Sequence, residues 1–544
     1  MRPRPRAATL ALLATGSLAC GRTPTVIGEL DDGGRTDGFE DPPPGPGETE
    51  GEVNCIESPE LCVAELSLRR AVDILFVIDD SGSMGGDQGT LARSFGTFID
   101  VLEAQQVGAN YRIGITTTDG DGLLHATSCR SRLDDFVSDS EIYGYKDERQ
   151  RGCLEHCELD SIGLSDAWVE KGDGTTNLPP GLDMAQVLQC IGPQGIAGSG
   201  FEMPLESMRR ALLEDVQGFL RPDALLAVIF VTDEADCSMD DDDLNWLATS
   251  GVAYWTHPDR LSSGACWTAG VQCIGGPGVY DTCEPANMGR SGIPVIDPNE
   301  ALLYPITRYV DTLTELAATK QAQGGQSEVL IAVLAGVPLD YPETGEILYA
   351  DSVDTQFNEE YGIGPGCGIG TETIDDPPGI PPVRLRQFAE AFASERRNMF
   401  SICADDYGVA LQDIADAIGG INSRACIAGC VHDLRYDIDG LQPDCRLVEA
   451  FADGQPDREV APCVVTEAGW DYPAPDVHVC ALALSDAEGL TPSPVDDMSP
   501  QCVTLGSNLE LVIQRREGIP VPAGTAVRVH CDLDAPVGVS CDER

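Results

Sequence analysis

The residues best suited to chemistry form a short segment rich in acidic and hydroxyl side chains, Asp79-Asp80-Ser81-Gly82-Ser83. Oxygen-bearing side chains occupy alternate positions in it, and the glycine eases a turn between them. Carboxylate and hydroxyl oxygens suit a hard divalent cation. Serine hydroxyls bind such a cation only weakly by themselves. The segment therefore predicts a metal site that needs a further carboxylate from elsewhere in the chain.

Asp233 is the carboxylate that fits this role. Asp79 ends the apolar run AVDILFVID at 71–79, and Asp233 follows the run ALLAVIFVT at 224–232. Continuous runs of β-branched and apolar residues are typical of strands buried on both faces. Doubly wound sheets bind ligands beyond the carboxyl ends of such strands. We therefore expect both aspartates at the same edge of one sheet.

Amphipathic helices alternate with the apolar strands. Leu91, Phe95, Phe98 and Leu102 recur at helical spacing, which predicts a helix between about 87 and 106. The same reasoning predicts further helices at 204–219, 304–320 and 407–418, and strands at 111–117, 329–334 and 399–403. This alternation predicts an α/β fold with a doubly wound, mostly parallel sheet.

Cysteine-bearing insertions interrupt this alternation at about 119–175, 251–300 and 337–380. They are too long for ordinary connections, so we expect disulfides to hold them. After Gly420 the chain carries eight cysteines among short apolar runs, which predicts a small cysteine-rich β domain at 421–544.

In its strand context, the D-x-S-x-S segment resembles the metal-ion-dependent adhesion site of von Willebrand factor type A (vWA) domains. The resemblance covers about residues 68–420 without the insertions. It implies that Ser81 and Ser83 ligate a metal directly, and that Asp79 and Asp233 do so directly or through water. The implied ion is Mg²⁺ or Mn²⁺, with Ca²⁺ as the alternative, and one coordination position stays open for an acidic side chain of a partner protein.

One ligand of the family has no direct counterpart. The family uses a threonine from an intervening loop, where this chain reads Gly198-Ser199-Gly200-Phe201-Glu202. Ser199 is the natural substitute, and Glu202 is the alternative carboxylate ligand. The sequence leaves this fifth position open.

Simpler interpretations compete with the metal site. Residues 79–83 fit a capped turn, and Asp233 fits a solvated strand end. The acidic run 240–243 is typical of a solvated helix start. Cys153, His156 and Cys157 have a spacing that suits zinc, but an even cysteine count favours disulfides.

The first residues are typical of a secretory signal peptide, with arginines at 2, 4 and 6 before an apolar stretch. Cleavage before Cys20 fits two routes. General signal peptidase would leave Cys20 as a free thiol. The alternative is a bacterial lipobox, in which Cys20 is acylated and becomes a lipid anchor. Ser17 departs from that pattern, which usually has an aliphatic residue at this position. Because the other 20 of the 21 cysteines form an even set from Cys55 onward, lipidation leaves none unpaired.

The predicted organisation has four parts. They are a signal peptide at 1–19, a lipidated Cys20 with an acidic Pro/Gly-rich tether at 20–54, a vWA domain at 55–420 and the cysteine-rich β domain at 421–544. The tether is too polar to form a core. We expect an exported protein of the cell envelope, with the outer membrane or cell surface preferred, attached to the membrane by its lipid.

Composition narrows the function. A formal charge of -56 over 544 residues repels nucleic acid, and no G-x-S-x-G, H-E-x-x-H or P-loop motif is present. The missing motifs favour a protein that is not an enzyme, and the vWA resemblance implies one that binds an acidic protein ligand through a metal. The alternatives are an envelope scaffold with a vestigial metal site or, less favoured, a metal-dependent hydrolase.

Overall fold

The computed structural model describes most of the chain beyond residue 52. The described residues are 53–55, 62–68, 71–103, 110–140, 145–148, 150–172, 175–213, 218–222, 224–322, 329–368, 378–393, 398–422, 424–427, 430–435, 441–450, 456–466, 469–487, 496–499, 502–503, 507–516 and 526–535. The predicted signal peptide, Cys20 and nearly all of the tether lie outside them. None of the described helices is both long and apolar enough to cross a membrane.

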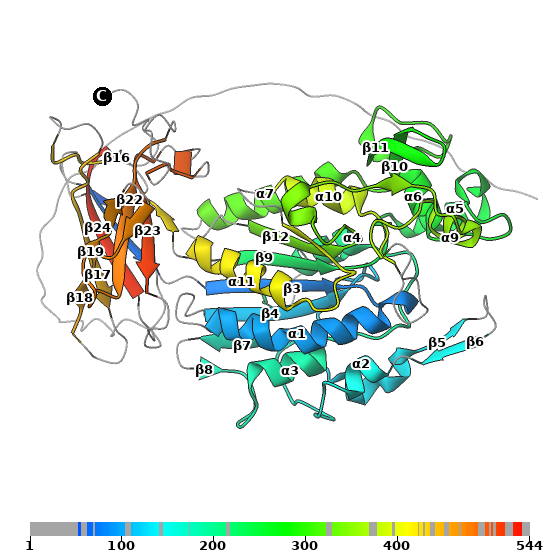
Figure 1. Ribbon diagram of the computed structural model, residues 1–544, viewed down its shortest axis with the longest axis horizontal. Helices are drawn as coiled ribbons and strands as arrows, with labels where there is room; N and C mark the ends of the chain where they lie inside the picture. Colours follow the sequence, from blue (N-terminus) through cyan, green and yellow to red (C-terminus); the bar gives the residue numbers. More distant parts are fainter. Residues whose placement is uncertain are drawn as a thin grey trace, which may run out of the picture. The chain divides into compact units, whose positions relative to one another are not determined.

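A seven-stranded sheet, ordered β14-β12-β9-β3-β4-β7-β8, forms the centre of the α/β region (Figure 1). Its first five strands pair in parallel, and β7 is antiparallel to β4. The strands are β3 (Ala71–Ile78), β4 (Asn110–Thr117), β7 (Trp168–Gly172), β8 (Thr175–Thr176), β9 (Ala224–Val231), β12 (Val329–Ala335) and β14 (Met399–Ser401). The sequence predicted the five parallel strands. It missed β7 and β8, which lie inside a cysteine-bearing insertion.

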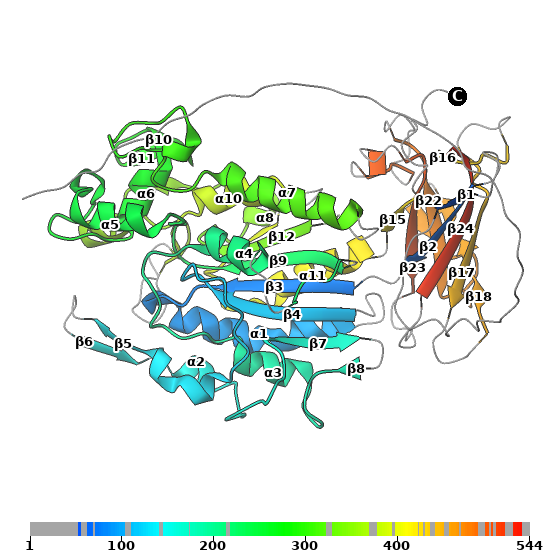
Figure 2. The same ribbon diagram turned by 180° about the vertical axis from the view of Figure 1, so that it is seen from behind.

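Helices cover both faces of this sheet, as Figures 1 and 2 show from opposite sides. The clusters of buried apolar side chains place α1, α3 and α11 on one face and α4, α7 and α10 on the other. These helices are α1 (Gly85–Glu103), α3 (Met184–Ile191), α4 (Pro204–Leu213), α7 (Ile306–Ala322), α10 (Val383–Glu390) and α11 (Gly408–Asn422). The mixed α/β fold with a mostly parallel sheet is thus confirmed.

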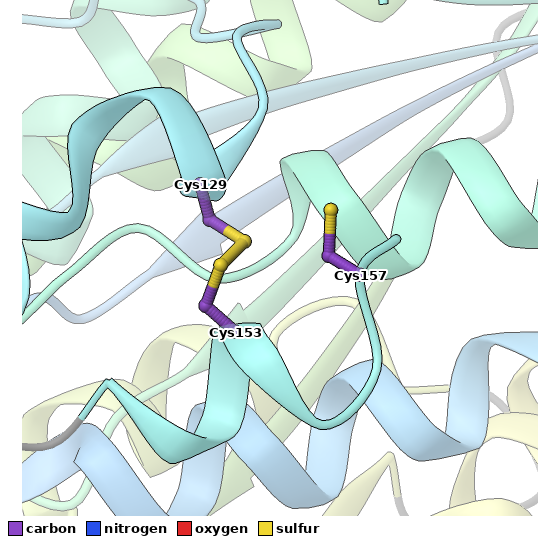
Figure 3. A group of neighbouring side chains, drawn as sticks. All are labelled: Cys129, Cys153 and Cys157. Carbon is purple, nitrogen blue, oxygen red and sulfur yellow. A yellow bond between two sulfur atoms is a disulfide. The ribbon is translucent and has the colours of Figure 1, made fainter. Parts of the chain in front are cut away.

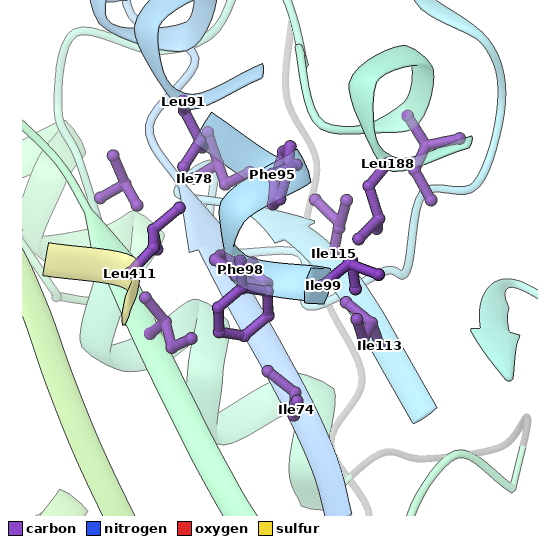
Figure 4. Packing of buried hydrophobic residues seen from close by; sticks show 14 of the residues in the cluster. Ile74, Ile78, Leu91, Phe95, Phe98, Ile99, Ile113, Ile115, Leu188 and Leu411 are labelled. Atoms are coloured by element: carbon purple, nitrogen blue, oxygen red, sulfur yellow. The ribbon is translucent and has the colours of Figure 1, made fainter. Parts of the chain in front are cut away.

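The burial of both faces of β3 explains why its sequence is continuously apolar. Ile74, Phe76 and Ile78 face the cluster with α1, whereas Leu75 and Val77 face the cluster with α4. The ring of Phe76 meets those of Phe95 and Phe98 edge-on, with centroids 5.4 and 5.6 Å apart, and Figure 4 shows the packing of this cluster. Since both faces of β3 are buried, helices fix the strand from both sides.

The insertions carry short elements of their own, including the hairpin of β5 and β6 and the small sheet β10-β11-β13. These elements are η2 (Cys129–Phe136), η3 (Val252–Tyr254), η4 (Pro298–Glu300), α2 (Arg151–Leu154), α6 (Gly264–Gly270), α8 (Tyr341–Thr344), α9 (Thr355–Tyr361), β5 (Val137–Ser140), β6 (Tyr145–Glu148), β10 (Val271–Gly275), β11 (Val279–Pro285) and β13 (Tyr349–Ala350). Two further short helices lie outside the insertions, η1 (Gly82–Met84) after β3 and α5 (Asp241–Thr249) after β9.

Disulfides hold these insertions, as the sequence predicted. The described pairs in the α/β region are Cys129–Cys153, Cys157–Cys190, Cys237–Cys266, Cys273–Cys283 and Cys367–Cys403. Further along the chain they are Cys426–Cys502, Cys445–Cys531 and Cys463–Cys480. Such a disulfide-rich protein is typical of oxidising compartments outside the cytoplasm.

The described residues after 423 form mainly β-strands. Together with β1 and β2 they build a sheet with the path β1-β2-β24-β17-β18, in which β16 also pairs with β24. They also form a second sheet, β15-β23-β22-β19, and the hairpin β20-β21. The strands are β1 (Val53–Cys55), β2 (Cys62–Leu68), β15 (Arg424–Cys426), β16 (Cys430–Val431), β17 (Cys445–Ala450), β18 (Arg458–Glu459), β19 (Ala461–Pro462), β20 (Val464–Thr466), β21 (Gly469–Asp471), β22 (Val479–Leu484), β23 (Glu510–Arg515) and β24 (Ala526–Ala535).

Strand β2 pairs across the predicted boundary between two domains. The sequence predicted one domain at 55–420 and the next at 421–544. Strand β2 lies in the first range and pairs antiparallel with β24 of the second over seven residues, from Cys62 opposite Leu533 to Leu68 opposite Val527. Pairing between strands this far apart leaves no local sign in a single sequence.

Candidate metal site at the carboxyl edge of the sheet

The candidate site lies where β3 and β9 end side by side. Ile78 is in register with Val231 in the parallel ladder, and the Asp79 N–H donates to the Val231 carbonyl at 2.9 Å. Because both strands run in the same direction, the loops that follow them leave the same edge of the sheet. This is the edge where doubly wound folds bind ligands, and the sequence predicted Asp79 and Asp233 there.

Four predicted ligands meet at this edge. The Ser83 hydroxyl donates to Asp233 Oδ1 at 3.1 Å, and the hydroxyl oxygens of Ser81 and Ser83 are 3.0 Å apart. Asp79 Oδ1 accepts the Ser81 N–H at 2.8 Å. Three of the four are almost fully buried, with exposed fractions of 0% for Asp79, 2% for Ser81 and 3% for Asp233. Oxygen atoms from two distant loops thus converge.

The simpler interpretation of this loop as a capped turn is met in part. The Asp79 carboxylate accepts the Ser81 N–H, as in a capped turn. Ser81 precedes the short helix η1, yet its side chain makes no capping hydrogen bond there. By contrast, the Asp240 carboxylate does accept the Asp243 N–H at the start of α5. The acidic run 240–243 is therefore a helix start, as the sequence indicated.

Ser199 does not join the other four ligands. Its loop lies beside the first one, since the Gly198 N–H donates to the Asp80 carbonyl at 2.9 Å. However, the Ser199 hydroxyl accepts the Phe201 N–H at 3.0 Å, and its own N–H donates to Asp119. Among the hydrogen bonds of the described residues, none links Ser199 to the D-x-S-x-S loop.

Glu202, the alternative that the sequence ranked lower, lies next to Asp79. Its side chain is 1% exposed and accepts a hydrogen bond from the Thr118 hydroxyl. Its carboxyl group is also within hydrogen-bond reach of the Asp79 carboxyl. Glu202 thus lies beside Asp79, and the identity of the fifth ligand stays a prediction. The order of residues along the loop does not reveal which of them points inward.

The site concentrates buried negative charge. Burial is the largest cause that raises the pKa of Asp79, and it raises the pKa of Glu202 and Asp233 well above the usual range. Repulsion from Asp79 adds to the effect for Glu202 and Asp233. Burial raises the pKa of both Asp80 and Glu234 to about 8, with added repulsion from Asp119 and then Asp79 for Asp80, and from Asp79 for Glu234. A bound cation would relieve this repulsion.

Three carboxylate oxygens in this region are buried without a hydrogen-bond donor. They are Asp80 Oδ1, Glu202 Oε1 and Glu234 Oε2. A buried polar atom without a partner costs free energy, and a bound ion or water is one way in which a native protein satisfies it. The residues present thus fit a divalent cation with oxygen ligands.

Two residues that the sequence analysis missed position these ligands. The Thr232 hydroxyl donates to Asp79 Oδ2 at 2.6 Å. The Gln88 amide donates to the Asp79 and Gly195 carbonyls at 2.7 Å each, and its oxygen accepts the Gly195 N–H at 3.0 Å. Gln88 precedes Leu91 by three positions and so extends the apolar stripe of α1. A polar residue on such a stripe was the available signal.

The cysteine group near α2 is not a metal site of free thiols. Among the described residues, Cys129, Cys153 and Cys157 form the only set of three acidic, histidine or cysteine ligand atoms within 4.8 Å of one another. However, Cys129 is bonded to Cys153 and Cys157 to Cys190, and Figure 3 shows the first of these disulfides. The expectation of disulfides over zinc is confirmed here.

Comparisons with known proteins found no match in sequence and only weak structural similarity. No protein-family model matches the sequence, and no curated protein matches it. Among solved structures, the pilus adhesin SpaC of Lactobacillus rhamnosus GG in its open conformation aligns over 89% of this chain and 42% of its own, at 11% identity and TM-score 0.26. The human COPII-coat protein Sec24c aligns over 89% and 48%, at 8% identity and TM-score 0.24.

The chain spans less than half the length of either protein. Both TM-scores are low, so we infer function from the side chains of the site alone.

Proposed function

We propose that this chain binds a divalent cation, Mg²⁺ or Mn²⁺, between the loop at 79–83 and the loop that begins at Asp233. We propose that it uses this ion to bind a carboxylate of a partner protein. The observation that carries the proposal is the hydrogen bond from Ser83 to Asp233, which brings the two loops together. Asp79, Ser81, Ser83 and Asp233 would hold the ion, in the manner that the vWA resemblance implies, with Glu202 as the further ligand.

This function needs a cation whose charge is only partly neutralised by its ligands in the site, so that it can still attract one carboxylate of the partner. Hard divalent ions prefer oxygen ligands and accept an additional carboxylate when a coordination position is open. Gly82 is exposed and Ser83 partly exposed, whereas the carboxylates below them are buried. A partner would therefore approach over the Gly82 turn. The high net negative charge slows the encounter of an acidic partner more than it weakens a direct metal bond, because salt screens long-range repulsion.

We further propose that the protein is an exported lipoprotein of the cell envelope, anchored through Cys20. The disulfides support an oxidising compartment. A tether between the lipid and the folded region would keep the binding site accessible to partners. Incorporation of labelled palmitate into the wild type but not into Cys20→Ala tests this anchor.

Calorimetric titration with Mg²⁺, Mn²⁺ and Ca²⁺ tests the metal site. We expect binding by the wild type and by Asp242→Ala, which removes an exposed carboxylate on α5. We expect Asp79→Ala to lose binding. If Asp79→Ala binds these ions as the wild type does, the metal site is refuted and the scaffold alternative is favoured.

Capture of partners from an envelope extract tests the binding function. We expect a protein that is retained with Mg²⁺, released by EDTA and not retained by Asp233→Ala. The partner should then bind as a purified protein, and loss of one of its acidic side chains should abolish that binding. A partner that remains bound in EDTA would contradict metal-dependent adhesion.

A further inference from the structure

We propose that three arginines near the candidate metal site, Arg209, Arg210 and Arg308, form an arginine cluster that binds a second acidic group of the partner protein. This inference rests on the proposed function for the identity of the partner, but the arginine cluster itself needs no metal ion. It follows from the convergence of the three side chains on one glutamate, from the positive charge that remains there and from the loop that joins them to the site.

The arginine cluster is built around Glu206 of α4, whose side chain is 2% exposed. Arg209 Nη1 and Arg210 Nε donate to its Oε1 at 3.4 and 3.2 Å. These two arginines follow Glu206 by three and four positions, so they lie on the same face of the helix. From α7, Arg308 donates to both carboxylate oxygens at 3.4 Å, and the Tyr309 hydroxyl donates to Oε2 at 3.2 Å. One buried carboxylate thus gathers three guanidinium groups.

Positive charge remains in the arginine cluster after this pairing. Glu206 balances one of the three arginines, and the ion pairs of the described residues join them to no other carboxylate. Burial and then Asp240 raise the pKa of Tyr304, so Asp240 lies nearby, but its carboxylate accepts the Asp243 N–H. Even with Asp240 counted, three guanidinium groups face two carboxylates. Local positive charge on a chain of formal charge -56 favours an anionic ligand at this place.

The arginines keep hydrogen-bond donors for such a ligand. Their side chains are 24%, 38% and 33% exposed. Within the described part of the chain, no acceptor lies at Arg209 Nη2, Arg210 Nη2 or Arg308 Nη1, and these nitrogens are not buried. The Arg308 guanidinium also stacks over the Tyr304 ring, 4.2 Å from its centroid. Because Glu206 and Tyr304 already hold these side chains, a ligand loses less free energy in ordering them.

The arginine cluster is joined to the candidate metal site by the loop that follows β4. Arg210 Nη1 donates to the Gly120 carbonyl at 2.6 Å, and the Gly120 N–H donates to the Ser207 hydroxyl at 2.8 Å. Thr118 of the same loop donates to the Glu202 carboxylate. Helix α4 itself begins two residues after Glu202. The arginine cluster and the metal site thus lie on neighbouring loops at one edge of the sheet.

An acidic peptide segment is the ligand that fits both places. The proposed metal site requires one carboxylate from the partner. Guanidinium groups bind carboxylates through paired N–H donors, and the arginine cluster already binds that of Glu206 in this way. Repulsion from the rest of the acidic surface disfavours other orientations of an acidic partner. At physiological salt this repulsion is screened over about 8 Å, so direct contacts with the arginines remain attractive.

Fluorescence anisotropy of a labelled poly-glutamate peptide in EDTA measures the arginine cluster without a metal ion. At about physiological ionic strength, we expect the full wild-type chain to bind this peptide. The double variant Arg209→Gln/Arg308→Gln should bind it about tenfold more weakly, because two half-exposed charges are lost. Arg210 and Tyr309 still bind Glu206 in this variant, and circular dichroism checks that it is folded.

The matched control is Arg93→Gln/Arg151→Gln, which removes two exposed arginines from α1 and α2 and should bind the peptide as the wild type does. No binding by the wild type would overturn the arginine cluster, and so would equal binding by the wild type and Arg209→Gln/Arg308→Gln. A wild type that binds a sulfated polysaccharide but not the peptide would overturn the acidic peptide as ligand. Peptide binding in EDTA, together with calorimetry that detects no cation, would support the arginine cluster and refute the metal-dependent function.

Discussion

Thr232 Oγ1 lies 2.6 Å from Asp79 Oδ2, although 153 positions separate the two residues along the chain. The hydroxyl donates to the carboxylate from the neighbouring strand end. It therefore fixes the orientation of a predicted ligand. Hydrogen bonds of this kind around a metal site commonly change affinity when they are removed.

We expect Thr232→Val to weaken divalent-cation binding by about 10- to 100-fold, because Asp79 loses the bond that orients it. Thr232→Ser keeps the hydroxyl and should bind within a few fold of the wild type. Calorimetric titration with Mn²⁺ measures both variants. Equal affinities for the valine and serine variants would show that the hydroxyl does not orient the ligand.

Gln88→Ala should lower the free energy of unfolding. Gln88 is 1% exposed, and its amide joins Asp79 to the loop at Gln194 and Gly195. Loss of the side chain leaves buried backbone groups without partners, at about 1–3 kcal/mol for each. Chemical denaturation measures the change, and Thr97→Ala on the exposed side of α1 serves as the control. A Gln88→Ala midpoint equal to that of the control would contradict the prediction.

Without cations, thermal stability should rise as the pH falls below about 8. Asp80 and Glu234 have a folded-state pKa of about 8, against ordinary values of 3.8 and 4.5. The folded protein therefore binds protons more tightly than the unfolded chain does. The stabilising effect of those protons is complete below the ordinary values and is lost as the pH rises through the folded-state pKa.

Thermal unfolding in EDTA across this pH range measures how the melting temperature changes with pH. The double variant Asp80→Asn/Glu234→Gln should reduce this change, which separates the effect of these two groups from that of the general negative charge of the protein. Cations compete with the same protons, so their affinity should fall toward lower pH. A melting temperature in EDTA that drops on mild acidification would run against this account.

The double variant Cys129→Ser/Cys153→Ser should destabilise the protein by about 3 kcal/mol, because the disulfide closes a loop of moderate length. The two cysteines are 24 positions apart. Zinc should not bind in the native protein, and peptide mapping without reduction should recover the Cys129–Cys153 and Cys157–Cys190 links. Recovery of free thiols together with bound zinc would refute the disulfide assignment.

The amides of β2 should be protected from hydrogen exchange together with those of β24. In the full chain, residues 62–68 pair with residues 527–533 of β24. A chain that ends before residue 526 should exchange rapidly over 62–68, while β3 at 71–78 stays protected by its own neighbours in the large sheet. Unchanged protection of 62–68 in the shortened chain would show that β2 pairs elsewhere. Exchange followed by mass spectrometry distinguishes the two outcomes.

The sequence by itself determined the main α/β elements and two of the loops that meet in the site. Continuous apolar runs at β3 and β9 follow from burial on both faces, and parallel strands carry their following loops to one edge. That reasoning was enough to place Asp79 near Asp233, because it depends only on periodicity and strand direction.

Only the tertiary structure decided the contacts between distant segments. It turned Glu202 rather than Ser199 toward Asp79, and it joined Thr232 and Gln88 to that aspartate. It also paired β2 with β24 and chose the partners of the cysteines. These choices depend on how side chains and strands pack against one another in three dimensions. Local propensity, hydrophobic period and spacing carry no information about such packing.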